Sequence, residues 1–599
     1  MLVLPSQLKG LPPTLGKFLL GILTGAILII LIGVIGFLAI ASLKSKPPSV
    51  ADGSTLIIHL SGDVPERPPV EIPLPFLQDK ASVTVLNLWS MLRRAAADSR
   101  IKAVVLEPEG TQIGWAKMQE IRADIETFRK SGKPIYAFLK APSTREYYLA
   151  SACTKIYMGP ADMLGLKGLR LELTYFKNTF DKLGVQMEVE HAGKYKDYGD
   201  MYTRTSMSPE TKEILNGIAD NVYGDLVTTV AKGRNKDRAQ LRAIVDNGPF
   251  LSAQAKQNGL VDELKYEDEM FADLKKLLKQ TELKKLSEHD YVNVPDSSSS
   301  SLDRIAWVVG EGTITRGDAD GDGTDGLQSE QFVKTLAKIG ADSTLKAVIV
   351  RIDSPGGEVT ASDQMWAAMN QLSKKKPMVI SMSDAAASGG YYMAMTGDTI
   401  IAYPGTETGS IGVVMAKPSL KGLYDKIGIT KDFITRGKYA MLESEYQPLT
   451  PDNRAKIREG IDANYVDFVK KVADARKKTS AVIEPLAQGR VRMGDQAQAN
   501  GLVDELGGID KAIELVRKKA GIPATAKVHL VPYPGKRSLL DFFLHSSSSS
   551  SEQDARKQAE ALLSGVGFED LRTALKDARL RVWTKGGMLK MMPFSLDFH

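Results

Sequence analysis

One serine in this chain lies in a setting that suits a nucleophile. The stretch Ala-Ser-Gly-Gly places Ser388 directly before Gly389 and Gly390. A serine followed by two glycines, at a turn from strand to helix, exposes its hydroxyl and lets backbone N–H groups approach a ligand. Upstream, Ser-Pro-Gly-Gly places Gly356 and Gly357 after a buried strand, where consecutive glycines can present N–H donors to a developing oxyanion. Together these residues indicate nucleophilic attack on a carbonyl group.

The base for this serine cannot be a histidine of the same region. A serine nucleophile needs a neighbouring base. The histidines of the chain are His59, His191, His289, His529, His545 and His599. None of them lies in the core region around Ser388, so a local Ser-His-Asp triad is unavailable. The other solution is a lysine whose pKa is lowered by burial in an apolar cleft.

A duplication in the sequence indicates where that lysine is. The heptapeptide NGLVDEL occurs at 258–264 and again at 500–506. IKAVVLEPEG, which begins at Ile101, matches LKAVIVRIDS, which begins at Leu345, with nearly the same separation. Similarity at a nearly constant offset indicates two copies of one domain.

The two copies differ in a complementary way at the residues that could do chemistry. GKYKDY in the first copy aligns with GKYAML in the second, so that Lys196 faces Ala440. Ser388 and its glycines stand opposite Thr144-Arg145-Glu146. The first copy therefore has an extra lysine and lacks the serine, and the second has the serine and lacks that lysine. This pattern predicts a Ser-Lys dyad that is divided between the copies.

The elements that must position these residues follow an α/β pattern. Short apolar runs such as AVIVRI and MVISM alternate with helical patterns, which favours an α/β fold with a largely parallel, buried sheet. We expect six segments along the chain. They are a short tail (1–17), a transmembrane anchor (18–43), a first repeat that supplies the lysine (54–285), a serine-containing linker (286–301), a second repeat that supplies the nucleophile (302–520) and a partly helical C-terminal tail (521–599) that serves packing or oligomerisation.

The anchor is predicted from a stretch without charge at 18–43, which exceeds the roughly 20 residues needed to cross a bilayer. A cleaved signal peptide is the alternative, because Ala-Ile-Ala at 39–41 resembles a cleavage site. The apolar core of a signal peptide is only about 7–15 residues, which favours the anchor. Lysines flank both ends, so the charges do not determine the orientation.

Composition excludes several other classes of protein. The formal net charge of +6 is not gathered into a basic stripe with aromatic residues, so nucleic acid is not expected as a partner. The single cysteine, Cys153, excludes an intrachain disulfide and a cysteine-based zinc site. The Asp-rich segment 317–330 resembles a calcium loop, but its twelfth position is Ser329 rather than Glu, so a surface loop is expected. No metal or other cofactor is predicted.

Four motifs in order resemble the signal peptide peptidase A family in its long, tandem-repeat form (peptidase family S49). They are DSPGGEVTASDQMWAAM, AAASGGYYMAM, GTETGSIGVV and AQGRVRMGDQAQANGLVDELGG. The resemblance covers most of the chain from about residue 54 to about 520, and the N-terminal anchor. It implies two tandem crotonase/Clp-protease-like domains, each a spiral of ββα units. It also implies an anchored endopeptidase of the bacterial inner membrane, with its catalytic region on the periplasmic side, which degrades signal peptides and other apolar, extended peptides.

The resemblance also assigns roles to individual residues. Ser388 matches the nucleophile of the family, and Lys196 matches its general base. Gly389 matches the oxyanion donor that follows the nucleophile, and either Gly356 or Gly357 matches the second donor.

Further expectations concern the surroundings of the lysine. Ser410 in TGSIG matches a serine that orients it, and the counterpart of Ser410 in the first copy is Leu166. Lys194 occupies a position where relatives have a small polar residue, which makes Lys194 a fallback base. The resemblance implies a ring-like homo-oligomer, a tetramer, and the dyad could form within one chain or between two.

Two other functions remain open at this point. The crotonase superfold also uses glycine N–H donors on an oxyanion, so a crotonase-type enzyme acting on acyl-CoA is one alternative. A non-catalytic membrane scaffold is the other, and it predicts that replacing Ser388 has no enzymatic consequence.

Overall fold

A computed structural model describes residues 25, 28, 48–67, 83–295, 303–317, 326–535 and 588–592. The anchor predicted at 18–43 lies outside the described residues, except for Gly25 and Leu28. The serine run of the linker, most of the Asp-rich segment and the helical part of the C-terminal tail also lie outside them. Within the described ranges, no helix combines the length and the apolar character needed to cross a bilayer.

The first half of the chain forms a parallel sheet, as expected, in the order β8-β4-β3-β2-β1-β9. Its strands are β1 (Ser54–Gly62), β2 (Ile101–Thr111), β3 (Ile135–Leu139), β4 (Lys155–Met158), β8 (Glu263–Leu264) and β9 (Lys284–Ser287). The central strand β3 is buried along its whole length, and its residues Ile-Tyr-Ala-Phe-Leu are apolar or aromatic. Such runs are typical of a sheet that is covered on both faces.

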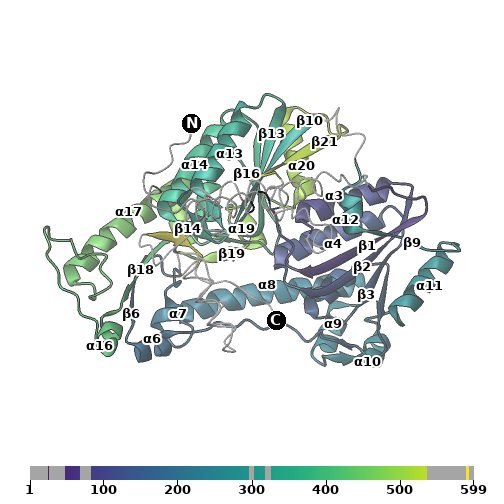
Figure 1. The fold of residues 1–599 in the computed structure, drawn as a ribbon, viewed down its shortest axis with the longest axis horizontal. Coiled ribbons are helices and arrows are strands. Elements are labelled where there is room, and N and C mark those ends of the chain that lie inside the picture. Colours follow the sequence, from purple (N-terminus) through teal and green to yellow (C-terminus); the bar gives the residue numbers. More distant parts are fainter. Residues whose placement is uncertain are drawn as a thin grey trace, which may run out of the picture.

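The second half repeats this order with equivalent strands (Figure 1). The parallel series runs β20-β16-β15-β13-β10-β21. Its strands are β10 (Asp303–Glu311), β13 (Leu345–Ser354), β15 (Met378–Ala387), β16 (Thr399–Ala402), β20 (Glu505–Leu506) and β21 (Val528–Tyr533). The end of β15 pairs in addition with β17 (Glu407–Gly409), which pairs with β19 (Val491–Met493). The chain is therefore mixed α/β with parallel sheets.

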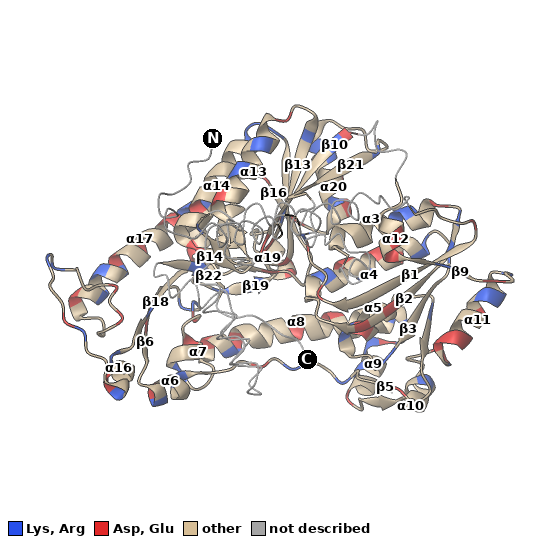
Figure 2. Ribbon diagram, in the orientation of Figure 1, with Lys and Arg blue, Asp and Glu red and all other residues tan. Residues whose placement is uncertain are grey.

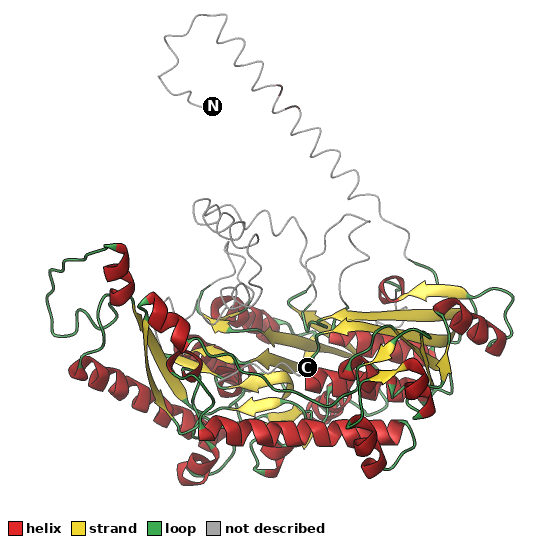
Figure 3. Ribbon diagram, turned by 90° about the horizontal axis from the view of Figure 1, so that it is seen from below, coloured by secondary structure: helices red, strands yellow, loops and turns green. Residues whose placement is uncertain are grey.

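Helices pack around these sheets (Figure 3). In the first half they are α3 (Val85–Ala97), α4 (Trp115–Arg129), α5 (Thr144–Ala150), α6 (Lys177–Leu183), α7 (Asp200–Thr203), α8 (Pro209–Gly233), α9 (Arg238–Val245), α10 (Ser252–Gln257), α11 (Glu267–Leu277) and α12 (Glu288–Val292). In the second half they are α13 (Ser329–Ala341), α14 (Val359–Ser373), α15 (Gly389–Met393), α16 (Lys421–Ile427), α17 (Pro451–Ala475), α18 (Ser480–Ile483), α19 (Gly494–Ala499) and α20 (Ile509–Ala520). Outer helices such as α11 and α17 carry many charged residues, whereas β1 carries no Lys, Arg, Asp or Glu (Figure 2).

The two long helices, α8 and α17, begin in the same way. The side chain of Ser208 accepts a hydrogen bond from an N–H of the first turn of α8, and Thr450 does the same for α17. Proline occupies the first turn of both helices, where its missing N–H costs nothing.

The repeated heptapeptide has the same structural role in both halves. The hydroxyl of Tyr147 donates to the carbonyl of Leu260 at 2.7 Å, and the hydroxyl of Tyr391 donates to the carbonyl of Leu502 at 2.8 Å. The aspartate that follows accepts from the arginine that comes directly after the long helix in both halves, Arg234 after α8 and Arg476 after α17. NGLVDEL therefore recurs because it fastens the long helix to the sheet.

A third sheet crosses between the halves, in the order β12-β11-β14-β22-β18-β6. Its strands are β6 (Gln186–Ala192), β11 (Ile314–Thr315), β12 (Leu327–Gln328), β14 (Gly356–Glu358), β18 (Val413–Ser419) and β22 (Leu589–Met591). The strand β6 of the first half pairs over seven residues with β18 of the second half. This pairing carries the loop that follows β6 toward the second half. A separate two-stranded ladder joins β5 (Met163–Leu164) to β7 (Phe250–Leu251).

Candidate active site

Ser388 lies at a strained turn between β15 and α15. Its φ and ψ are 53° and −112°, a conformation that a residue with a side chain rarely adopts. The turn is held on both sides, because the Ser388 N–H donates to the Gly409 carbonyl at 2.8 Å and the Ser388 carbonyl accepts from the Tyr392 N–H at 2.8 Å. Such strain at a buried serine is typical of a strand-to-helix turn that aims a hydroxyl.

Lys196 comes from the first half and reaches this serine. The residue lies in the loop between β6 and α7 and is fully buried. Its Nζ lies 2.8 Å from the Ser388 Oγ, 2.8 Å from the Ser410 Oγ and 2.9 Å from the Ser410 carbonyl oxygen. The structure thus brings together the three side chains that the sequence singled out as nucleophile, base and orienting group, and it does so within one chain.

The surroundings favour the neutral amine of Lys196. Burial lowers the pKa of Lys196 well below its ordinary value, because an ammonium group loses its hydration there. The charge of Asp197 opposes this effect, and the charge of Lys590 adds to it. A neutral amine has two N–H donors and one lone pair. The two oxygen atoms of Ser410 can accept both donors, which leaves the lone pair for the hydroxyl proton of Ser388.

Lys194, the fallback base, lies elsewhere. Its side chain is exposed, and its Nζ lies 3.8 Å from a carboxylate oxygen of Glu210.

A second loop, which contains Gly489, holds Lys196 in place. Its residues were not among those predicted for the site. Gly489 has a φ of +74°, and a Cβ added to it would lie 2.7 Å from the Cβ of Lys196. Its N–H donates to the Ile411 carbonyl at 2.7 Å, and the N–H of Tyr195 donates to the Gln488 carbonyl at 2.8 Å. This loop belongs to the stretch Ala-Gln-Gly-Arg in the fourth of the motifs that resemble the family. The sequence therefore contained the motif, but no role was assigned to these residues.

The glycines that follow β13 and β15 converge on one point. A Cβ added to Gly356 would lie 2.6 Å from the Gly389 nitrogen and 2.1 Å from the Lys590 carbonyl oxygen. The N–H of Gly356 already donates to the Ser354 Oγ at 3.2 Å. Gly357, in contrast, is paired with Lys590 in the ladder between β14 and β22. Of the two glycines, Gly357 is therefore the better placed to donate a hydrogen bond from its N–H to a carbonyl oxygen at this point.

The equivalent place in the first half is closed. Glu146, which aligns with Gly390, is buried there. Its carboxylate accepts hydrogen bonds from the Thr111 N–H at 2.7 Å and from the Ser143 N–H at 2.8 Å. The Glu146 carboxylate thus accepts from the backbone N–H groups that could otherwise bind a ligand. The described residues therefore form one site with glycine N–H donors beside a serine, rather than two.

The strand β22 at this site was not predicted. The segment 521–599 is predicted as a partly helical tail, with no strand assigned to it, whereas β22 lies between β14 and β18. Its residues are Leu-Lys-Met, a run too short and too far along the chain to be recognised as part of the sheet.

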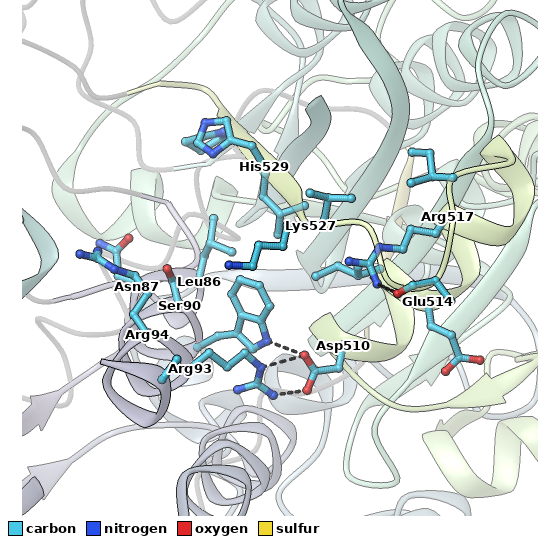
Figure 4. Close-up of a pocket in the computed structure, with 18 of the residues that line it drawn as sticks. Leu86, Asn87, Ser90, Arg93, Arg94, Asp510, Glu514, Arg517, Lys527 and His529 are labelled. Atoms are coloured by element: carbon cyan, nitrogen blue, oxygen red, sulfur yellow. Dashed lines mark hydrogen bonds and ion pairs between the residues drawn. The ribbon is translucent and has the colours of Figure 1, made fainter. Parts of the chain in front are cut away.

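A hollow of about 1200 Å³ lies apart from the dyad, between α3, α20 and β21. Figure 4 shows Arg93 and Asp510 joined across it, and the Arg93 Nε donates to Asp510 at 2.9 Å. None of the proposed catalytic residues lines this hollow, and its contacts join the two halves. Among the described residues, no group of three His, Cys, Asp or Glu side chains is arranged to hold a metal ion.

Comparison with known proteins gives a family match in both halves. The model of peptidase family S49 matches residues 127–281 and 370–523. The chain is 35% identical over 545 residues to the chloroplastic serine protease SPPA of Arabidopsis thaliana, which covers 87% of this chain and 79% of that protein. It is 29% identical to Protease 4 of Salmonella typhi, over 90% of this chain and 89% of that protein. A putative signal peptide peptidase SppA of Enterococcus faecium is 33% identical over 32% of this chain and 56% of its own length.

Proposed function

This chain belongs to peptidase family S49 and is a serine peptidase, and we propose that Ser388 and Lys196 are its catalytic dyad. The observation that carries the proposal is the contact of 2.8 Å between the Lys196 Nζ and the Ser388 Oγ, at a fully buried position. A crotonase-type enzyme acting on acyl-CoA would not need this contact, nor would a scaffold.

The geometry supports acyl transfer through the serine. The neutral Lys196 amine takes the proton of the Ser388 hydroxyl as Oγ attacks the peptide carbonyl carbon. The N–H groups of Gly389 and Gly357 donate to the oxyanion that forms. The Lys196 ammonium then protonates the leaving nitrogen, and water hydrolyses the resulting ester. Ser410 positions the amine throughout, because both of its oxygen atoms contact Nζ.

Extended peptides are the substrates that fit this site. The strands β14 and β18 face each other across the width of one strand, the place that β22 occupies. A peptide in that place gains main-chain hydrogen bonds from both sides, which is recognition by strand addition. Apolar residues such as Val414 and Ala416 line the place, so apolar peptides, including cleaved signal peptides, are the proposed class.

We extend the proposal to location and assembly on the basis of the sequence. The uncharged stretch 18–43 anchors the protein in a bilayer, which we propose is the bacterial inner membrane with the catalytic region on its periplasmic side. Each half is proposed to be a ββα spiral of the crotonase/Clp type, since the two parallel sheets share one strand order. The assembly is proposed to be a homo-oligomer.

A serine-reactive fluorophosphonate probe tests the dyad. We expect the probe to label the wild-type protein at Ser388 and not to label Ser388→Ala. Labelling of Lys196→Ala should be slower by about 10²–10⁴-fold, the usual contribution of a general base. Lys194→Ala is the matched control, because its exposed side chain lies apart from the site, and it should label as wild type does. If Lys196→Ala reacted at the wild-type rate, Lys196 would not be the base.

A further inference from the structure

The side chain of Gln488 binds the loop that carries Lys196. Its Oε1 accepts a hydrogen bond from the Lys194 N–H at 3.1 Å. The carbonyl of the same residue accepts from the Tyr195 N–H at 2.8 Å. Gln488 thus accepts from two consecutive N–H groups directly before Lys196, one with its side chain and one with its main chain. These bonds fix the main chain from which the Lys196 side chain extends.

Two glycines allow the loops of Gln488 and Lys196 to approach closely. A Cβ added to Gly193 would lie 2.6 Å from the carbonyl carbon of Gln488. One added to Gly489 would lie 2.7 Å from the Cβ of Lys196. A side chain at either position would push the two loops apart, so they pack main chain against main chain.

The amide of Gln488 is held in one orientation. Its Nε2 donates to the Tyr465 hydroxyl at 3.1 Å and to the Glu484 carboxylate. The Tyr465 hydroxyl donates in turn to Glu484 at 2.8 Å, and burial raises the pKa of Tyr465, so the hydroxyl keeps the proton that it donates. Acceptors on one side of the amide leave Oε1 to face the Lys194 N–H. A reversed amide would set donor against donor at Lys194 and acceptor against acceptor at Glu484.

The residues that follow Gln488 connect the same loop to Ser410. The Gly489 N–H donates to the Ile411 carbonyl at 2.7 Å, and the Arg490 carbonyl accepts from the Ser410 N–H at 2.8 Å. Three successive residues therefore bind the main chain of the proposed base and that of the serine that contacts its amine. The position of this loop sets where these two parts of the site lie relative to each other.

The main chain of Gln488 is strained. Its φ is +57°, in the left-handed region that glycine and asparagine tolerate best. Ser388 and Ser410, with φ values of +53° and +51°, lie in the same region. Strain of this kind persists only where the surrounding structure holds it, and it concentrates at functional sites. The bonds of the Gln488 side chain are what hold this glutamine in place.

The first half lacks this glutamine. Counting back from the two copies of NGLVDEL, which begin at Asn258 and at Asn500, places Asp246 opposite Gln488. Asp246 is exposed, and its φ of −62° is that of an ordinary helix end. Among the two aligned positions, the glutamine therefore occurs only in the loop that meets Lys196.

We propose that Gln488 is a positioning residue of the peptidase reaction, which holds the main chain before Lys196 so that its amine reaches the Ser388 hydroxyl. This inference rests on the proposed dyad. Without the amide of Gln488, the loop of Lys196 loses one of these two bonds, and the amine moves from its place and meets water. A displacement of about 1 Å costs roughly 10²-fold in rate. Contact with water also moves the pKa of Lys196 toward its ordinary value, because burial is what lowers it.

Labelling of the full chain by a fluorophosphonate probe, measured across pH, tests Gln488→Gly. Glycine accepts a φ of +57° without strain and keeps the carbonyl that binds the Tyr195 N–H, so the variant should fold. Its maximal labelling rate should fall by about tenfold or more. The half-saturating probe concentration should change by less than about twofold, because Gln488 acts on the base and not on binding. The midpoint of the pH–rate profile should move to higher pH, while Asp197 and Lys590, whose charges act on Lys196, are unchanged.

Two further variants separate positioning from a general effect on the fold. Tyr465→Phe leaves Gln488 in place and removes the hydroxyl that orients its amide, so it should show the same changes with a smaller loss of rate. Gln496→Ala is the matched control. It removes a glutamine amide of the same half, which accepts from the Met493 N–H at 3.2 Å and lies outside the loop of Gln488. It should label as wild type does, with the same midpoint.

Lys196→Ala, labelled in the same series, separates the possible failures. If Lys196→Ala reacts slowly and Gln488→Gly reacts at the rate of Gln496→Ala, the inference is wrong and the dyad stands. The same conclusion follows if only the half-saturating concentration of Gln488→Gly changes, or if its midpoint stays in place or moves to lower pH. If Lys196→Ala reacts at the wild-type rate, the dyad fails and the inference fails with it. Circular dichroism shows whether each variant is folded, and Tyr465→Phe decides by the same criteria if Gln488→Gly is not.

Discussion

At the scale of single residues, the site depends on the three oxygen atoms around one amine. The Lys196 Nζ contacts the Ser388 Oγ and both oxygen atoms of Ser410, and no carboxylate is among these partners. A carboxylate partner would hold the ammonium form and prevent proton transfer from the serine. Neutral oxygen partners and burial instead favour the uncharged amine of Lys196, because burial lowers its pKa.

The pH dependence of hydrolysis should report this neutral lysine. The value of kcat/KM for an added peptide should rise with pH as Lys196 loses its proton, with a midpoint well below the ordinary lysine pKa because burial disfavours the ammonium. Asp197→Asn removes a charge that raises the pKa of Lys196, so the midpoint should move to lower pH. A pH–rate profile of both proteins measures the midpoints. A midpoint at the ordinary lysine value, or one that moves upward in Asp197→Asn, would contradict this account of the base.

At the scale of elements, the cleft is a gap of one strand between β14 and β18. Its width is set by the crossing sheet, in which β6 and β18 pair over seven residues and β14 continues toward β11. A strand in the gap meets main-chain donors and acceptors on both sides, whatever its side chains are. Main-chain pairing therefore supplies general affinity, and the apolar residues that line the gap, such as Val414 and Ala416, supply preference.

Methylation of single peptide nitrogens separates these two contributions. A synthetic peptide with the sequence of residues 586–592, in which Lys590 is the single lysine, should be hydrolysed by the enzyme. An N-methyl group on the position of Lys590 removes the N–H that faces the Gly357 carbonyl and should lower kcat/KM roughly tenfold or more. The same group on the position of Gly587, outside the paired residues, should change it little. Equal effects at both positions would contradict recognition by strand addition.

At the scale of the whole molecule, the site exists because the two halves are held together through buried charges. Arg351 in β13 is fully buried and bonds to Glu66 at 2.8 Å and also to Glu120 in α4. Glu120 additionally accepts from the Ile509 N–H at 2.8 Å, which ties α4 to the start of α20. Breaking such a group leaves uncompensated charge in the interior, which costs far more than the loss of a surface pair.

Replacement of Arg351 should therefore destabilise the protein. We expect Arg351→Met to lower the free energy of unfolding by about 3–5 kcal/mol, measured by urea unfolding. Arg170→Met, which removes an exposed ion pair with Glu172, is the matched control and should cost less than about 1 kcal/mol.

The pH dependence of this loss has a definite sign. Burial already raises the pKa of Glu120, and removal of Arg351 raises it further. A carboxyl group whose folded pKa lies above its unfolded value stabilises the fold at low pH, and this contribution is lost as pH rises through the folded value. The deficit of Arg351→Met should therefore shrink as the pH is lowered from neutral toward the unfolded glutamate pKa. A deficit that is constant with pH would argue against a cost from buried charge.

The sequence by itself determined the type of fold and singled out the two residues of the proposed dyad. Apolar runs that alternate with helical patterns are a local property, and they predicted the parallel sheets found in both halves. The sequence alone also shows that Lys196 is present only in the first copy and Ser388 only in the second. Because a duplication retains the scaffold residues in both copies, the residues that differ between the aligned copies can be recognised. The sequence alone also shows that no histidine lies in the region of the chain around Ser388.

Only the tertiary structure distinguished the two candidate donors and placed a strand beside them. Gly356 and Gly357 are equivalent in sequence, and they differ because the N–H of Gly356 is taken by the Ser354 Oγ. The strand β22 has three residues, and its conformation comes from pairing with β14 and β18, which lie far away along the chain. Short strands take their structure from their partners rather than from their own composition, so no local signal could place Lys590 beside Gly389.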